Sequence, residues 1–145
     1  RDALRLCDGA LREEALPAEQ RAATHVNRGI IQMRAGQYAA AIADYDEAIR
    51  LRPDTAESYV NKGIALLNWG NHASEAVALL SAGIERGPVK PELAYFSRGI
   101  ANEALGRLRD AYEDYSRAAQ MAPGWAAPVA ELERFQTVTR KTAGA

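Results

Sequence analysis

Cysteine and histidine are scarce in this chain of 145 residues, which contains only Cys7, His25 and His72. A single cysteine permits no internal disulfide bond and no cysteine cluster for a metal ion. We therefore expect Cys7 to be a small buried hydrophobic residue. Aromatic residues make up 7% of the chain and apolar residues 48%, a balance that is typical of an alanine-rich helical protein with a sizeable core.

The chain also has almost no net charge, because 18 basic side chains oppose 19 acidic ones. A balanced chain has no electrostatic preference for phosphate backbones or anionic lipids, so we predict no nucleic-acid partner. No apolar run reaches the roughly 18 residues of a membrane-spanning helix, so we predict no transmembrane segment. The sequence starts at Arg1 within an apparent helix, which leaves open an upstream segment, a removed signal peptide, and a cytoplasmic or periplasmic location.

What the chain does contain is one pattern that occurs three times. The segments HVNRGII, YVNKGIA and YFSRGIA begin at His25, Tyr59 and Tyr95, and their glycines are spaced 34 and then 36 positions apart. Matching residues follow each glycine once one extra residue is admitted in the segment GNHASEA of the second copy. Such a period predicts a stack of helical hairpins. The aligned residues are Gly29, Gly36, Ala41, Tyr45, Ala48 and Pro53, then Gly63, Gly70, Ala76, Leu80, Gly83 and Pro88, then Gly99, Gly106, Ala111, Tyr115, Ala118 and Pro123.

This pattern resembles the tetratricopeptide repeat, in which small residues, aromatic residues and a proline recur over about 34 residues. The resemblance covers residues 22 to 125 and implies an all-α fold, a right-handed α-solenoid of antiparallel helix pairs. Two family positions differ in every copy, which makes the ligand surface harder to predict. The leucine before the glycine is replaced by Arg28, Lys62 and Arg98, and a later tyrosine by Gln32, Leu66 and Asn102.

Packing arguments favour the same architecture. Gly29 and Ala48 fall where the two helices of a repeat must approach closely, and a larger side chain there would push them apart. Tyr45 and Tyr115 are expected to fill the neighbouring space while each hydroxyl keeps a polar partner. The proline of each copy ends the second helix, and the glycine seven positions after the first one forms the turn.

We therefore expect one domain, 1–145, with first helices near 20–35, 56–69 and 91–105 and second helices near 38–52, 73–87 and 108–121. After residue 125 a narrow apolar stripe opposes charged residues, which is typical of a helix that caps a solenoid. The predicted divisions are an N-terminal helix at 1–16 that resembles half a repeat, repeats at 22–55, 56–90 and 91–125, a capping helix at 126–140, and a disordered tail at 141–145.

No catalytic group of residues is recognisable, so we predict that the protein is not an enzyme. His25 occupies a tyrosine position of the other copies and is expected to pack as an aromatic substitute, whereas His72 is expected in a solvated turn. The carboxylates around Asp44 and Asp114 are expected on solvated helix faces rather than in an acid–base pair. No phosphate loop, Ser-His-Asp order or metal-ligand spacing occurs, so we predict no cofactor and no metal ion.

Binding is the remaining class of function, and the resemblance implies that the first helices line a concave groove. We predict a scaffold that binds a peptide or helix of a partner protein there. The groove residues that the resemblance implies are Val26, Ile30, Met33 and Arg34, then Val60, Ile64, Leu67 and Asn68, then Phe96, Ile100 and Glu103, together with a possible row of hydrogen-bonding side chains at Asn27, Asn61 and Ser97.

The family members that clamp acidic chaperone tails use a lysine and an asparagine where this chain has Val26 and Ile30, so the resemblance favours a more apolar ligand. Several alternatives remain open at this stage. Asn27 and Asn61 could bond across helices within the stack, and the apolar stripe could be core or lie under the C-terminal helix. The chain could also form a homodimer, or be a non-catalytic part of a larger protein or enzyme complex.

Overall fold

The computed structural model describes residues 2–12 and 16–144, and for residues 137–143 it describes the backbone alone. Within these ranges the chain forms eight helices and no strand, which confirms the all-α prediction. The helices are α1 (Asp2–Arg12), α2 (Ala18–Arg34), α3 (Tyr38–Leu51), α4 (Ala56–Trp69), α5 (Ala73–Glu85), α6 (Pro91–Ala104), α7 (Leu108–Met121) and α8 (Ala126–Ala143).

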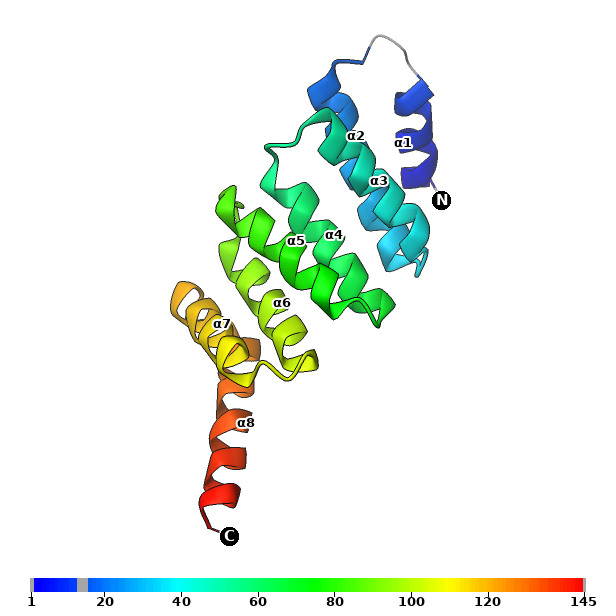
Figure 1. The fold of residues 1–145 in the computed structure, drawn as a ribbon. Coiled ribbons are helices and arrows are strands. Elements are labelled where there is room, and N and C mark those ends of the chain that lie inside the picture. Colours follow the sequence, from blue (N-terminus) through cyan, green and yellow to red (C-terminus); the bar gives the residue numbers. More distant parts are fainter. Residues whose placement is uncertain (1, 13–15, 145) are drawn as a thin grey trace.

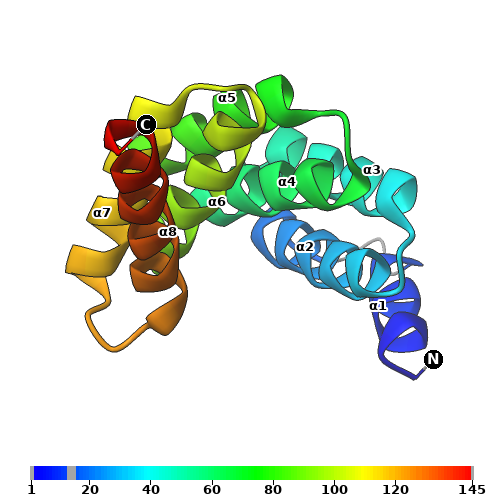
Figure 2. The same ribbon diagram turned by 90° about the horizontal axis from the view of Figure 1, so that it is seen from below.

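Three helix pairs form the body of the molecule: α2 with α3, α4 with α5, and α6 with α7. The pairs stack in chain order, with α1 packed on α2 at one end and α8 packed on α7 at the other (Figure 1). Seen from below, the stack is an arch in which α2, α4 and α6 lie on the inner side and α3 and α5 on the outer side (Figure 2). The first helices of the repeats therefore line a concave face, as expected for a solenoid.

The three repeated glycines explain the close approach within each pair. A Cβ atom added to Gly29 would lie 2.6 Å from the Tyr45 ring, and one added to Gly99 would lie 2.7 Å from the Tyr115 ring. In the middle pair, a Cβ on Gly63 would lie 2.8 Å from Cγ of Leu80. No real Cβ fits at such distances, so a large side chain of the second helix packs directly on a glycine of the first in every repeat.

The turns within the pairs also follow from the sequence. Gly36, Gly70 and Gly106 have φ angles of 76°, 92° and 75°, a left-handed conformation that favours glycine. One residue separates Gly36 from α3, whereas Asn71 and His72 separate Gly70 from α5. Asn71 itself has a φ angle of 61°. The extra residue of the second repeat is thus accommodated in this turn, and asparagine is one of the residues that tolerates such a φ angle best.

The ends of the helices agree with the positions of the prolines. α3 ends at Leu51 before Pro53, and α7 ends at Met121 before Pro123. At the carboxyl end, α8 continues to Ala143, so most of the segment predicted as a disordered tail is helical. Residue 145 lies outside the described residues, as does part of the segment predicted as the N-terminal helix, residues 13–15.

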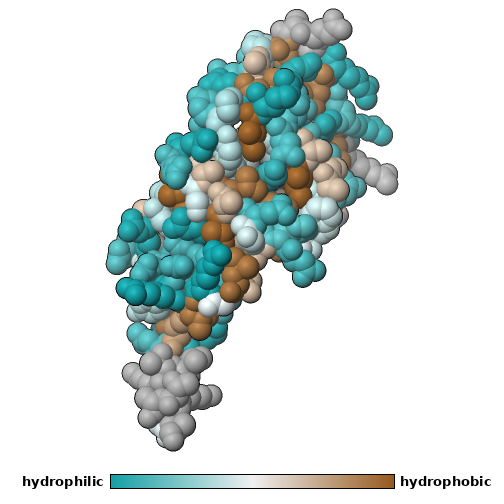
Figure 3. Space-filling view, viewed as in Figure 1, coloured by the Kyte–Doolittle hydropathy of each residue, from teal (hydrophilic) through white to brown (hydrophobic). Residues whose placement is uncertain are grey.

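The core runs through the middle of the stack. The largest buried cluster joins residues of α4, α5 and α6, and a second one joins α3 and α4. Most of their members are alanines, which lets neighbouring helices pack at short range. On the face shown in Figure 3, apolar residues form only a narrow band broken by hydrophilic side chains. The clusters are Val60, Leu66, Ala76, Leu80, Ala94 and Ala101, and Ala41, Tyr45 and Ala65.

Candidate functional site

The residue that follows each repeated glycine forms a row across the concave helices. Ile30 on α2 and Ile64 on α4 are half-buried, and Ile100 on α6 is 42% exposed. Because α2 contacts α4 and α4 contacts α6, these positions succeed one another along the inner side of the arch. The concave face therefore presents one partly exposed aliphatic side chain per repeat.

Two of the predicted groove residues lie in the interior instead. Val60 is 6% exposed, and its Cγ2 lies 2.6 Å from the place where a Cβ of Gly83 would stand. The missing side chain at Gly83 draws Val60 between α4 and α5, and so Val60 belongs to the core. Ser97 is also 6% exposed. Each side chain therefore exposes only a small edge, and that of Val60 lines a hollow described below.

Other predicted groove residues are shared between core and surface. Val26, Ile30 and Met33 are half-buried and pack against the cluster that contains Tyr45. Ile64 and Leu67 pack in the same way against the central cluster. The interpretation of the stripe as helix-to-helix core is therefore partly correct, since each of these residues has one side in the core and one side toward solvent.

The chain after α7 covers part of the third repeat's share of the groove. The Phe96 ring lies 4.8 Å from the Trp125 ring and 5.6 Å from that of Tyr115. Arg134 of α8 donates from Nη2 to both carboxylate oxygens of Glu103, at 2.5 and 2.6 Å. These contacts involve Phe96 and Glu103, whereas the isoleucine of α6 in the same row stays exposed.

Polar side chains border the concave helices α2 and α4. Asn27, Arg34 and Asn68 are exposed, and Asn61 is half-buried. Within the described part of the chain, Asn27 and Asn61 form no hydrogen bond across helices, so neither has an evident structural role there. Asn61 also lines an apolar hollow of about 270 Å³ between the start of α4 and the α5–α6 loop, beside Leu93 and the 85% exposed Val89.

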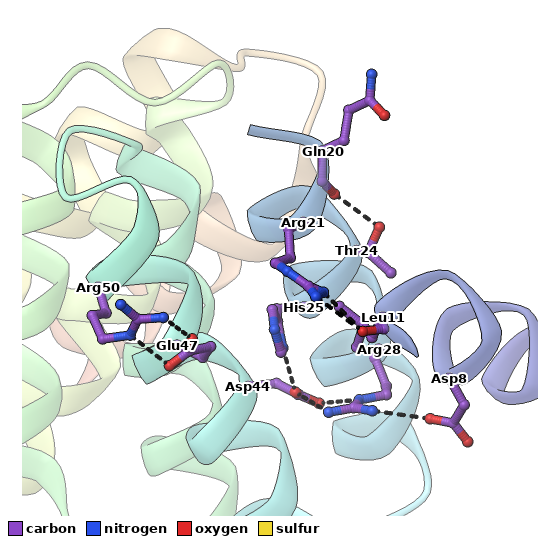
Figure 4. A network of polar contacts seen from close by, with 10 residues as sticks. All are labelled: Asp8, Leu11, Gln20, Arg21, Thr24, His25, Arg28, Asp44, Glu47 and Arg50. Atoms are coloured by element: carbon purple, nitrogen blue, oxygen red, sulfur yellow. Dashed lines mark hydrogen bonds and ion pairs between the residues drawn. The ribbon is translucent and has the colours of Figure 1, made fainter. Parts of the chain in front are cut away.

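Buried ion pairs hold α2 to α3 behind this face (Figure 4). Arg28 donates from Nε to Asp44 Oδ2 at 2.8 Å and from Nη2 to Asp44 Oδ1 at 2.6 Å. His25 Nδ1 lies 2.9 Å from the same Oδ1. Asp44 is 3% exposed, so the prediction of a solvated carboxylate is wrong for this residue. Likewise, His25 is more than an aromatic substitute, because its ring nitrogen binds a buried carboxylate.

The third repeat contains the same arrangement. Arg98 donates to Asp114 from Nε at 2.9 Å and from Nη2 at 2.7 Å, and Asn102 donates to Oδ2 at 3.0 Å. Asp114 is 4% exposed, so it too is wrongly predicted as solvated. The carboxylate hydrogen bonds raise the pKa of both arginines above its ordinary value, against the opposing effect of burial. Bidentate pairs of this kind fix the angle between two helices.

The same cations tie each pair to the helix before it. Arg28 donates from Nη1 to Asp8 of α1 at 2.9 Å. Lys62 Nζ lies 2.6 Å from Asp46 Oδ1 of α3, and Arg98 Nη1 donates to Ser81 Oγ of α5 at 3.1 Å. The cation that replaces the family leucine therefore connects consecutive units. The sequence signal for this role is a basic residue directly before every repeated glycine. In addition, an aspartate follows the first and the third of these glycines at a distance of 15 positions.

The tyrosines beside the glycines differ in their polar partners. Tyr115 donates its hydroxyl hydrogen to Glu103 Oε1 at 2.9 Å, as expected for a buried tyrosine. The Tyr45 hydroxyl is buried and has no hydrogen-bond partner among the described residues, which contradicts that expectation. The Tyr45 pKa is raised to about 12, mainly by burial. The charge of Asp44 also raises this pKa, and the charge of Arg34 lowers it.

The remaining candidate groups are His72 and Cys7. His72 is half-buried, its ring lies 5.0 Å from that of Trp69, and its Nδ1 lies 3.5 Å from Glu75. Cys7 is half-buried and free. Over residues 2–12 and 16–136, no three acidic, histidine or cysteine side chains are grouped as metal ligands. Nor does any described helix have the length and apolar character needed to cross a membrane.

Comparison with known proteins identifies the repeat. A sequence model of the tetratricopeptide repeat matches residues 26–91 and 70–125. Protein FlbA of Caulobacter vibrioides is 34% identical over 105 residues, which are 70% of this chain and 17% of FlbA. The mitochondrial import receptor subunit TOM70 of Rattus norvegicus is 31% identical over 86 residues, which are 59% of this chain and 14% of that subunit. The chain thus spans less than a fifth of the length of these relatives.

A solved structure shows the same helix arrangement. The second TPR domain of human RPAP3, determined in complex with the HSP70 peptide SGPTIEEVD, has a TM-score of 0.75 and 25% identity. The alignment covers 82% of this chain and 98% of that domain. The helix pairs described above are therefore those of an established repeat fold.

Proposed function

Because this chain belongs to the tetratricopeptide repeat family, we propose that it is a protein-interaction module that holds a peptide or helix of a partner protein against its concave face. The proposed contact set is centred on Ile30, Ile64 and Ile100, with Asn27 and Asn61 beside them. Known relatives support this class of function. One is an import receptor subunit, and the RPAP3 domain was solved with a bound peptide.

One observation carries the proposal. The residue after each close-packing glycine is an isoleucine in all three repeats, and none of the three is fully buried. An aliphatic row on the inner side of an arch matches the apolar face of an amphipathic helix or the alternate side chains of an extended peptide. The amides of Asn27 and Asn61 can donate to one backbone carbonyl and accept from a neighbouring N–H without reading sequence.

The ligand differs in chemistry from the acidic chaperone tails held by the clamp-type members of the family. Val26 and Ile30 occupy the positions of the lysine and asparagine of that clamp, and both pack against the core. Neither side chain can donate a hydrogen bond. We therefore propose a partner segment whose main anchors are aliphatic, with polar groups in a secondary role.

Ile100→Glu tests the proposal most directly, because this side chain is 42% exposed and its replacement leaves the core intact. The matched control is Leu108→Glu, a 56% exposed leucine at the start of α7. In a pull-down with peptide identification, Ile100→Glu should lose the partner that the wild type and Leu108→Glu both retain. Equal capture by all three proteins, with unchanged melting temperatures, would exclude the concave face as the binding surface.

Light scattering on the purified chain distinguishes this function from self-association. A monomer that binds a peptide supports the interaction module. A dimer that Ile100→Glu dissociates would show that a second copy of the chain occupies the concave face, and the proposed partner would then be replaced by a homodimer.

A further inference from the structure

The third repeat contains a polar arrangement that the first repeat has only in part. On the concave side of the third repeat, Glu103 accepts a hydrogen bond from the Tyr115 hydroxyl at 2.9 Å. Arg134 of α8 donates to the same carboxylate. The three groups form a chain of tyrosine, carboxylate and arginine, in which the carboxylate satisfies a hydroxyl that is otherwise buried.

In the first repeat, the tyrosine is present and the carboxylate is not. Tyr45 packs on Gly29 with the same ring edge that Tyr115 presents to Gly99, at 2.6 and 2.7 Å from the added Cβ. The position four residues after the glycine is Glu103 in the third repeat and Met33 in the first. Tyr45 is fully buried, and its hydroxyl lacks a partner in the described part of the chain. A buried donor without an acceptor lowers the stability of the fold, so an acceptor that binds to this hydroxyl would be stabilising.

Further donors surround the same place. Arg34 is exposed, forms no ion pair with any described residue, and lies close enough for its charge to act on the Tyr45 hydroxyl. The Asn68 amide of α4 lies 4.0 Å from the Met33 sulfur atom. Met33 thus packs against the cluster that contains Tyr45, its sulfur lies near the Asn68 amide, and Arg34 follows it in the chain. The side chains of Tyr45, Asn68 and Arg34 can all donate hydrogen bonds, and none has an acidic partner among the described residues.

We propose that the groove of the first repeat binds a carboxylate side chain of the partner, which takes the place that Glu103 holds in the third repeat. The carboxylate accepts a hydrogen bond from the Tyr45 hydroxyl and pairs with Arg34. The unbranched Met33 side chain, which is half-buried at the surface, turns aside to admit it. This inference rests on the proposed function and adds to it one acidic residue next to the aliphatic anchors.

The site differs from the acidic-tail clamp of the family. The clamp positions are occupied by Val26 and Ile30, whereas the donors of the proposed site are Arg34 at the end of α2 and Tyr45 on α3. The arrangement is supported by the chain's own third repeat. In the third repeat, the cation that pairs with the carboxylate comes from α8. In the proposed site of the first repeat, the cation is Arg34 of α2.

A first experiment tests the chemistry of the site without any partner. Met33→Glu places a carboxylate at the position of Glu103, and Met33→Gln is the control of equal size without charge. Met33→Glu should give the higher melting temperature of the two, and the difference should vanish when Arg34→Ala or Tyr45→Phe is added. If Met33→Glu melts no higher than Met33→Gln in the otherwise wild-type chain, the groups do not form a carboxylate site, and the proposal is wrong.

A second experiment uses a random peptide library displayed on phage and selected against the wild-type chain. We expect the selected peptides to combine aliphatic residues with one Asp or Glu. Replacing that acid by its amide should weaken binding to the wild type about tenfold, as for loss of a charge-assisted hydrogen bond. The same replacement in the peptide should leave its affinity for the double variant Tyr45→Phe with Arg34→Gln unchanged.

The outcomes separate this inference from the function on which it rests. If peptides bind and Ile100→Glu abolishes their binding, but the acid-to-amide change has no effect, then the carboxylate site is excluded and the interaction module stands. If the selection yields no peptide that Ile100→Glu weakens, then the concave face is not a peptide site, and both proposals fall together.

Discussion

The outer two repeats and the middle repeat build the same helix pair with different interiors. In the first and third, a tyrosine packs on the glycine and an arginine clasps a buried aspartate, Asp44 or Asp114. In the middle repeat, Leu80 packs on the glycine, and the position of the aspartate is taken by the half-buried Leu79. Lys62 forms an ion pair with a residue of the preceding repeat, Asp46.

This difference shows which features the fold requires and which it only tolerates. Every repeat keeps the glycine, the large side chain that packs on it and the cation that reaches the preceding helix. The buried ion pair is present in two repeats and replaced by aliphatic packing in one. Since a buried pair and a well-packed apolar pair of similar volume can be close in stability, both solutions are compatible with one backbone.

The largest expected effect is at the feature that all repeats share. Gly29→Leu and Gly63→Leu should each cost about 3 kcal/mol or more, because the new side chain would overlap a fully buried neighbour, Tyr45 or Leu80. The control is Gly9→Ala in α1, where an added Cβ meets no atom within 4 Å and helix propensity improves by up to about 1 kcal/mol. Urea denaturation measures all three. A mild effect at Gly29 or Gly63 would contradict the packing described here.

A smaller loss is expected when one partner of a buried pair is removed. Asp114→Ala should cost about 3 kcal/mol, because it leaves Arg98 and Asn102 without their shared acceptor. Asp46→Ala is the matched control, since its carboxylate is 53% exposed where it pairs with Lys62, and its loss should cost less than about 1 kcal/mol. Thermal unfolding followed by circular dichroism would show whether the two losses differ as stated.

Exchanging the interior of the middle repeat should change stability little. The double variant Lys62→Arg with Leu79→Asp introduces the arginine–aspartate clasp of the outer repeats and should remain within about 1 kcal/mol of the wild type. Leu79→Asp alone should be clearly less stable than the double variant, because lysine cannot form the bidentate pair. If the two variants have the same free energy of unfolding, the bidentate arginine–aspartate pair requires further residues around it and not these two positions alone.

The smallest effect concerns α8 and pH. Burial raises the Glu103 pKa, but hydrogen bonds from Arg134 and Tyr115 lower it more, so the folded-state pKa lies below the ordinary value of 4.5. The stability that Glu103 contributes is therefore complete above about pH 4.5 and is lost as the pH falls through the lower, folded-state pKa. Trp125 fluorescence in a Trp69→Phe background reports the contact between Phe96 and Trp125, the residue directly before α8.

In that background, acidification below pH 4.5 should release α8 in the wild type at a pH set by the Glu103 carboxylate. With Glu103→Gln added, the fluorescence at neutral pH should already be shifted toward that of the acidified protein, and the remaining change on acidification should be smaller. An identical acid transition with and without Glu103→Gln would show that other carboxylates control the position of α8.

The fold was predictable because its main determinants recur at fixed offsets. Glycine, alanine and proline positions repeat with one insertion, and a pattern of three copies identifies helix pairs without any knowledge of their contacts. The site was less predictable. Asp44 and Asp114 resemble ordinary surface carboxylates on an amphipathic helix, and only the pairing with Arg28 and Arg98 on the neighbouring helix makes their burial understandable.

Exposure along the groove was the least predictable property. Val60 occupies the same repeat position as Val26 and Phe96, yet it is buried because the second repeat has Gly83 where the others have alanine. The cover over Phe96 comes from Tyr115 and Trp125, and it depends on how the chain packs after α7, which no local pattern in the sequence encodes. Long-range packing of this kind has to be seen in three dimensions.

The backward-reaching cations give the array a polarity. Cutting the stack after the second repeat leaves Arg28 with Asp8 and Lys62 with Asp46, so every remaining basic residue of the series keeps its anchor. Cutting away α1 instead strips Arg28 of Asp8 at the new first unit. Deletions of equal size at the two ends are therefore not equivalent, because loss of α1 removes an acceptor from a cation that remains, whereas loss of the third repeat leaves every other cation of the series paired.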